Sequence, residues 1–96
     1  MVEIRRTESF DDWARNLRDR SAPARINARI RRLELGNPGD VKHFGEGVSE
    51  LRVDYGPNYR VYFTQRGNVM IILLCGGDKR SQDSNIAKAK KLAKEV

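Results

Sequence analysis

The sequence predicts an α+β domain in which an N-terminal strand and a helical hairpin pack on an antiparallel sheet and a helix ends the chain. Apolar residues recur with the helical period in the first third of the chain and again after residue 81. Between these segments, residues 50–64 alternate apolar and polar side chains, as strands do, and an apolar run follows at residues 69–75. The predicted order is β-α-α-β-β-β-α, in a single domain that spans residues 1–96.

Two helices are predicted after a short strand at residues 2–4. Ser9 followed by Asp12 is typical of a capping box, and the helix that it begins extends to about residue 19. The second helix begins at Ser21, has Pro23 in its first turn and ends before Gly36, after which residues 37–40 form a loop. The short connection between the helices predicts an antiparallel hairpin. The apolar positions that define the two helical faces are Phe10, Trp13, Ala14, Leu17, Ile26, Ile30 and Leu33.

The second half predicts a three-stranded meander followed by a helix. Strands at residues 50–54 and 59–64 are joined by a turn at 56–58, and Gly67-Asn68 is a strong hairpin signal. The run at 69–75 is apolar on both faces, which predicts the central strand, ended by Gly76-Gly77. The last helix covers residues 81–96, with lysines on one side. Its apolar stripe consists of Ile86, Ala89, Leu92, Ala93 and Val96.

The composition is that of a globular protein, because 39% of the residues are hydrophobic and 33% are charged. The longest apolar run is too short to cross a bilayer, and the first residues lack the apolar stretch of a signal peptide. The single cysteine, Cys75, excludes an internal disulfide. We therefore expect a cytoplasmic protein with no membrane contact.

Signatures of common enzyme classes are absent from the sequence, including a phosphate-binding glycine loop, CxxC, HExxH and GxSxG. His43 has no histidine or cysteine nearby and is interpreted as a surface loop residue. Cys75 and Trp13 lie at apolar positions and are interpreted as core residues. We expect neither a cofactor nor a metal ion, because no cluster of carboxylates could hold one.

The positively charged residues give the main indication of function. The net charge is +6, which attracts polyanions, either nucleic acid or an acidic protein. Arg52, Arg60 and Tyr62 lie at polar positions of two strands, and Lys79 and Arg80 follow the apolar strand. If those strands are neighbours, the cations converge on one surface and can stabilise a phosphoryl transition state. The alternative is a solvated sheet face on which Glu50 and Asp54 pair with the arginines.

The second predicted helix carries another group of cations. Arg25, Arg29 and Arg32 lie within one narrow arc and could contact RNA or an acidic partner, or form a solvated helix face. The lysine face of the last helix is a weaker signal, because exposed helical lysines are common.

The segments GVSELRVDYGPNYRVYF and IILLCGGDKRSQDSNIAKAKKLA resemble the addiction-module killer proteins, the Gp49/HigB-like branch of the RelE/ParE superfamily. With the two helices, the resemblance spans nearly the whole chain. Asn58 and Asn85 depart from the usual pattern, in which glycine and aspartate are commoner. The resemblance implies a compact ribonuclease-like toxin fold and a cognate antitoxin, usually a helix-turn-helix protein, with operator DNA bound through the complex.

The resemblance also implies roles for individual residues. Arg60 matches the arginine that mRNA-cutting relatives place at the scissile phosphate, and Lys79 matches a basic position after the apolar strand. The C-terminal histidine or tyrosine that several relatives use as acid or base is missing, so either Lys79 or Tyr62 acts as the base, or the chemistry is slow or absent. The residues assigned to RNA binding are Arg52, Tyr59, Arg80, Arg25, Arg29 and Arg32.

We therefore predict a metal-independent, ribosome-dependent mRNA endonuclease that inhibits translation, with the ribosome and mRNA as targets. The alternative is an inhibitor of DNA gyrase that acts by binding alone, as ParE relatives do. A third reading is a nucleic-acid-binding domain without toxicity.

Overall fold

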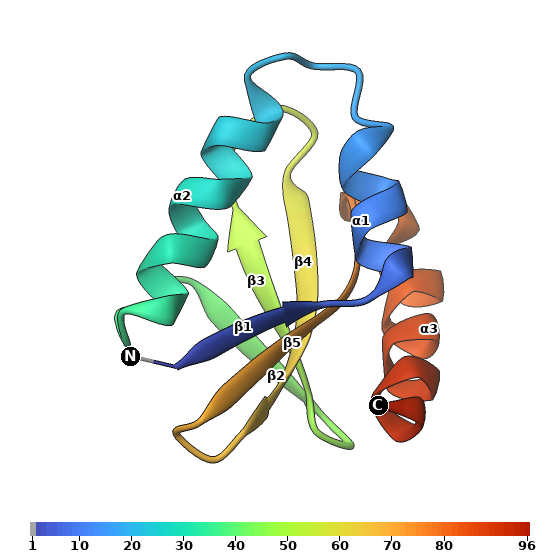
Figure 1. Ribbon diagram of the computed structural model, residues 1–96. Coiled ribbons are helices and arrows are strands. Elements are labelled where there is room, and N and C mark those ends of the chain that lie inside the picture. The colour runs from blue at the N-terminus through green and yellow to red at the C-terminus, as the bar shows by residue number, and fades with distance from the viewer. Residues whose placement is uncertain (1) are drawn as a thin grey trace.

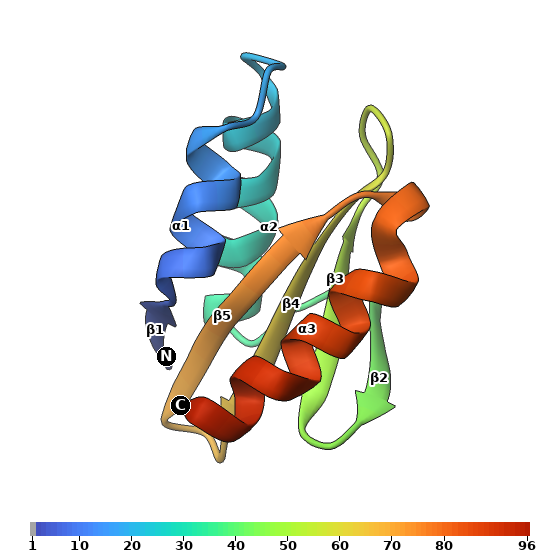
Figure 2. The same ribbon diagram turned by 90° about the vertical axis from the view of Figure 1, so that its right-hand side faces the viewer.

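The computed structural model describes residues 2–96 and has a five-stranded sheet with helices on both faces (Figures 1 and 2). The predicted α+β class and the order of its predicted elements are confirmed. The elements are β1 (Glu3–Arg6), α1 (Glu8–Arg15), α2 (Ala22–Glu34), β2 (Val41–Gly45), β3 (Val48–Val53), β4 (Tyr59–Arg66), β5 (Met70–Gly77), the 3₁₀ turn η1 (Lys79–Ser81) and α3 (Gln82–Glu95).

The sheet has the strand order β1-β5-β4-β3-β2 and differs from the prediction in two respects. First, β1 runs parallel to β5, so the sheet is mixed rather than antiparallel. Second, β2 was not predicted. It is a short edge strand whose side chains are exposed or half-buried, and such a strand shows little contrast between apolar and polar positions.

Two apolar cores lie on the two sides of the sheet. The helices α1 and α2 run in opposite directions over one face, and α3 covers the other (Figures 1 and 2). The larger core joins Phe10, Ile26, Ile30 and Leu33 to the facing strand residues. The smaller core packs α3 through Ile86, Ala89, Leu92 and Ala93 against Val48, Tyr62, Ile72, Leu74 and Cys75. The helical stripes predicted from the sequence pack against the two cores and are buried or half-buried, except that Val96 remains exposed.

Helix α1 begins earlier and ends earlier than predicted. Thr7, not Ser9, is the N-cap: its hydroxyl oxygen accepts a hydrogen bond from the Phe10 amide at 3.1 Å and donates to the Leu74 carbonyl at 2.6 Å. The helix ends at Arg15. The side-chain amide of the next residue, Asn16, donates a hydrogen bond to the Asp12 carbonyl at 2.7 Å. The connection to α2 is therefore longer than predicted. Ser21 precedes α2 as predicted but makes no side-chain capping bond.

Strand β5 is buried on both sides, as predicted, but it begins at Met70 and continues through both glycines. The prediction that it is the central strand is wrong, because it lies between β1 and β4, and β4 is the middle strand. A bulge shifts its pairing with β4 between Tyr62 and Phe63. Val69, predicted as the first residue of the strand, lies in the hairpin and is exposed. His43 lies in β2 rather than in a loop, and its Nδ1 is 2.6 Å from the Ser49 hydroxyl.

Gly76 lets α1 approach the sheet closely, which leads to a first prediction. A Cβ at this position would lie 2.2 Å from the Trp13 ring, so Gly76→Ala must displace the indole or the helix. We expect the free energy of unfolding to fall by about 1–3 kcal/mol, the usual cost of overpacking. Urea denaturation measures it, with Val69→Ala in the exposed hairpin as the control. Equal stability of the two variants would show that the contact with Trp13 adapts without cost.

Candidate functional site

A hollow of about 280 Å³ opens where β3 ends and β4 begins. The turn η1 borders it, because the end of β5 lies beside the start of β4. The hollow gathers three of the predicted cations, Arg52, Arg60 and Lys79, from two strands and a turn. The other lining residues are Asp40, Val53, Asp54, Asn58 and Tyr59. Asn58 has a positive φ of 63°, the left-handed turn conformation that asparagine tolerates.

The register of β3 and β4 explains why these side chains converge. Arg52 pairs with Arg60, and Glu50 pairs with Tyr62, so all four side chains project from the same face of the sheet. The prediction that Arg52, Arg60 and Tyr62 share one sheet surface is confirmed. That surface is not solvated, however, because Arg60 is 8% exposed and both Glu50 and Tyr62 are fully buried.

Glu50 is the centre of this surface. Its Oε1 accepts hydrogen bonds from Arg52 Nε at 2.8 Å and from Arg60 Nη1 at 2.9 Å. Its Oε2 accepts from the Tyr62 hydroxyl at 2.9 Å and from Gln82 Nε2 at 3.0 Å. The two oxygens are thus shared by four donors from β3, β4 and α3. We call Glu50, Arg52, Arg60, Tyr62 and Gln82 the Glu50 network.

The Glu50 network keeps its carboxylate ionised. Burial raises the pKa of Glu50, but the hydrogen bonds from Arg52 and Tyr62 and the charge of Arg60 outweigh it, so the pKa is lowered overall. Burial and the bond to Glu50 both raise the pKa of Tyr62, whose hydroxyl therefore keeps its proton. The hydrogen bond from Arg52 to Glu50 raises the pKa of that arginine.

A second prediction follows from the lowered pKa of Glu50. The stabilisation that its charge provides is fully present above the ordinary glutamate pKa and is lost as the pH falls through the lowered native pKa. Glu50→Gln lacks this charge at every pH. We therefore expect the difference in free energy of unfolding between wild type and Glu50→Gln to shrink from about pH 7 to about pH 3, measured by urea denaturation. A difference that does not change with pH would contradict this account.

Arg60 is fixed in place but keeps donors for a ligand. Nη1 is bound to Glu50, whereas Nε is buried and has no hydrogen-bond partner. A buried donor without a partner is rare in folded proteins. The second terminal nitrogen, Nη2, is not among the buried atoms without a partner, so it is the donor of Arg60 that an oxyanion in the hollow could reach. The arrangement suits an anion such as a phosphate.

Lys79 and Arg80 lie in η1, beyond the end of β5. Asp78 caps this turn by accepting bonds from the Arg80 amide at 2.9 Å and the Ser81 amide at 3.3 Å. Gly77 allows the turn to close against α3, because a Cβ there would lie 2.2 Å from Asn85 Oδ1. Lys79 is exposed at the rim of the hollow. Arg80 is not among the lining residues, and its side chain is 89% exposed, 3.7 Å from Asp78.

Tyr59 also lines the hollow, although its side chain packs in the larger core, on the face of the sheet opposite to the Glu50 network. Its ring is buried, lies edge-on to Trp13 at 6.2 Å and stacks with Tyr55 at 6.5 Å. Trp13 is half-buried and packs in the larger core, as predicted. Burial raises the pKa of Tyr59.

The three arginines predicted on one arc of α2 differ in environment. Arg29 binds backbone: Nη2 donates to the Pro38 carbonyl at 2.7 Å and Nη1 to the Arg52 carbonyl. Burial and the nearby Arg32 lower the pKa of Arg29. Arg25 and Arg32 are exposed. Arg29 thus holds the 37–40 loop against β3, which places Asp40 at the hollow.

The sequence reasoning missed the central position of Glu50 and the part played by Gln82. Glu50 was considered only as a surface partner of the arginines, together with Asp54. Asp54 makes no ion pair within 4 Å in residues 2–96, whereas Glu50 pairs with both arginines. The sequence could have shown this, because polar residues alternate along two predicted neighbouring strands. They are Glu50 and Arg52 on the first strand and Arg60 and Tyr62 on the second, and each faces a residue of the other strand.

Within residues 2–96, no three His, Cys, Asp or Glu side chains lie close enough together to hold a metal ion. Cys75 is buried, which raises its pKa to about 11, in agreement with the predicted core role. None of the described helices is long and apolar enough to cross a membrane.

Comparison with known proteins identifies the family. The family model described as phage-derived protein Gp49-like (DUF891) matches residues 8–95. The chain belongs to the Gp49-like family. This family is associated with toxins of addiction modules, in agreement with the predicted resemblance at that level. A protein of Haemophilus influenzae, described only as uncharacterized, is 50% identical over 95 residues, which cover 99% of this chain and 96% of that protein. No solved structure matches the chain.

Proposed function

We propose that this Gp49-like protein is the toxin of a toxin–antitoxin pair and cuts mRNA on the ribosome. The observation that carries the proposal is the hollow in which Arg52, Arg60 and Lys79 meet, with Arg60 fixed by buried Glu50. Two cations held by Glu50 and one exposed cation around a space of this size suit a phosphodiester. Family membership and the net charge of +6 support the same reading.

In the proposed reaction, the ribose 2′-oxygen attacks the adjacent phosphorus and the bond from phosphorus to the 5′-oxygen breaks. The products are a 2′,3′-cyclic phosphate and a 5′-hydroxyl, so one proton leaves the 2′-hydroxyl and one reaches the leaving oxygen. Arg60 and Lys79 stabilise the charge that grows on the phosphoryl oxygens. Arg52 attracts the phosphate and holds the position of Glu50.

The groups that could move these protons are limited by their positions. Tyr62, one of the two bases predicted from the sequence, is fully buried and its hydroxyl donates a hydrogen bond to Glu50, so we assign it a positioning role. Lys79 lines the hollow and remains a candidate. Asp40 and Asp54 also line it, and an ionised carboxylate can accept the 2′-hydroxyl proton while Lys79 protonates the leaving oxygen.

Growth assays test the toxin role and its partner. Expression of the chain alone should arrest growth, whereas co-expression with the protein encoded beside it, the proposed helix-turn-helix antitoxin, should not. Operator DNA would then be bound by the complex through the antitoxin. Harmless expression of folded protein by itself would contradict the toxin role.

Primer-extension mapping of transcripts after induction tests the reaction itself. We expect discrete cuts within translated messages, which disappear when translation initiation is blocked. Intact messages together with DNA-damage signalling would instead indicate inhibition of gyrase, and the endonuclease proposal would fall.

A further inference from the structure

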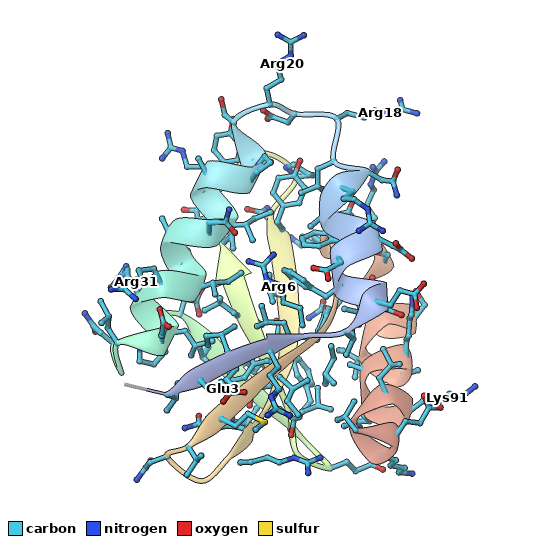
Figure 3. The ribbon with its side chains drawn as sticks, viewed as in Figure 1. Glu3, Arg6, Arg18, Arg20, Arg31 and Lys91 are labelled. Carbon is cyan, nitrogen blue, oxygen red and sulfur yellow. The ribbon has the colours of Figure 1, made fainter. Side chains whose placement is uncertain are left out.

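Arg25 and Tyr55 form a pair next to the hollow. Arg25 lies in the first turns of α2, and its guanidinium carbon is 5.0 Å from the centroid of the Tyr55 ring. Tyr55 lies in the turn between β3 and β4, where its hydroxyl donates to Asp19 Oδ2 at 3.0 Å. The connection from α1 to α2, which carries Arg18 and Arg20, lies at the same end of the molecule (Figures 1 and 3).

The position of the Tyr55 ring is fixed by its neighbours. It stacks on Tyr59 with an angle of 24° between the ring planes. The turn itself is closed by the bond from the Asn58 amide to the Tyr55 carbonyl at 3.1 Å. Gly56, with a φ of 59°, brings the turn close to the Tyr59 ring without a side chain in the way. Arg25 therefore contacts a ring that is held by a hydrogen bond at its hydroxyl and by stacking on Tyr59.

Arg25 differs from the other arginines of α2 in what it contacts. Arg29 donates to two carbonyls, and Arg31 pairs with Glu34. Within the described residues, Arg25 makes no ion pair and no side-chain hydrogen bond, and it is exposed. Its guanidinium lies over an aromatic ring, and the side chain is otherwise exposed with its donors unpaired in the described residues. A guanidinium plane in this state is a surface on which nucleobases stack.

The ring of Tyr59 connects this pair to the hollow. Tyr55 stacks on Tyr59 at 6.5 Å, and Tyr59 lines the hollow beside Arg60. Arg25 and Tyr55 do not line the hollow themselves, and we expect an RNA strand whose phosphate occupies the hollow to bring a neighbouring base to Arg25. We propose that Arg25, supported by the Tyr55 ring, is a stacking platform for one unpaired RNA base next to the phosphate in the hollow. This inference rests on the proposed function and adds to it the position at which a base is read.

The test uses the full chain and short single-stranded RNAs of about eight nucleotides, in which one nucleotide at a time is replaced by an abasic one. Affinity is measured at low salt by fluorescence anisotropy. For the wild type we expect one abasic position to weaken binding about tenfold, because a stacked base contributes that much. Arg25→Lys keeps the charge but lacks the plane, so it should bind intact RNA about tenfold more weakly and no longer distinguish the abasic RNA. Tyr55→Leu, which removes the support, should behave likewise.

Arg31→Lys is the matched control, since Arg31 is exposed at the other end of α2 (Figure 3) and should retain full discrimination. The stacking proposal is overturned if wild type binds intact and abasic RNAs equally at every position. It is also overturned if Arg25→Lys keeps the wild-type preference. If wild type binds no RNA at all, in solution or on ribosomes, the proposed function fails and the platform fails with it.

Discussion

Lys79→Ala is expected to lower the rate of mRNA cleavage about 100- to 1000-fold and so to abolish growth arrest. Lys79 is exposed at the rim of the hollow, and among the described residues it makes no ion pair and no side-chain hydrogen bond. Its removal should therefore change the free energy of unfolding by no more than about 0.5 kcal/mol. Growth after induction, cleavage of a translated message and urea denaturation together separate the loss of function from a loss of fold.

Arg60→Ala is expected to abolish growth arrest as well, because it removes a cation from the hollow and also destabilises the fold. The polar position of Arg60 on an alternating strand predicts an exposed side chain whose removal costs little stability. That prediction is wrong, because Arg60 is buried and bound to Glu50. Removing it takes away a charged partner of a buried carboxylate, which typically costs about 3 kcal/mol or more. Lys79→Ala is therefore the clean test of the hollow, and Arg60→Lys, which keeps the charge, is the better probe of Arg60.

The control for both variants is Lys88→Ala, an exposed lysine of α3 that does not line the hollow. It should remain as toxic and as stable as the wild type. If Lys79→Ala folds and is still fully toxic, the active surface does not include the hollow, and the exposed arginines of α2 become the next candidates.

The sequence predicted the elements that repeat an apolar period and missed those that depend on single contacts. The alternation around Leu51, Val61 and Phe63 and the run at 69–75 were sufficient for three strands, because their apolar side chains are buried. The start of α1 was missed because both Thr7 and Ser9 are suitable N-cap residues. The hydrogen bond from Thr7 to the Leu74 carbonyl, which favours Thr7 as the cap, joins residues that are far apart in the sequence. Strand β2 was missed because an edge strand buries too little to show a pattern.

The candidate site was predicted in its members but not in its environment. The sequence placed Arg52, Arg60 and Tyr62 on one face, and the register confirms it. It could not show that α3 covers part of that face, since this depends on how a helix at the end of the chain packs on the sheet. Because α3 covers this face, Tyr62 is a buried hydrogen-bond donor rather than a candidate base, and Glu50 is the group that holds Arg60 in place. Burial cannot be read from alternation when the polar side chains themselves form the interior.

Glu50→Ala is expected to lower the free energy of unfolding by about 3–5 kcal/mol, the usual cost of leaving buried charges without a partner. The substitution removes the acceptor of Arg60, Arg52, Tyr62 and Gln82, and Arg60 has little access to water as a replacement. Small domains are stable by only about 5–15 kcal/mol, so this loss is a large part of the total. Tyr62→Phe removes a single hydrogen bond to this carboxylate and should cost less, about 1.5–3 kcal/mol.

Urea denaturation of these variants is compared with that of Asp54→Ala, which removes an exposed carboxylate from the same hollow and should change stability little. If Glu50→Ala does not fold, Glu50→Gln provides the measurement, because the amide keeps an oxygen for the arginines but presents its NH₂ to Gln82. Its loss should lie between those of Tyr62→Phe and Glu50→Ala. Should Glu50→Gln prove as stable as Asp54→Ala at neutral pH, the charge of Glu50 would not hold the arginines, and the rigidity that we ascribe to Arg60 would need another source.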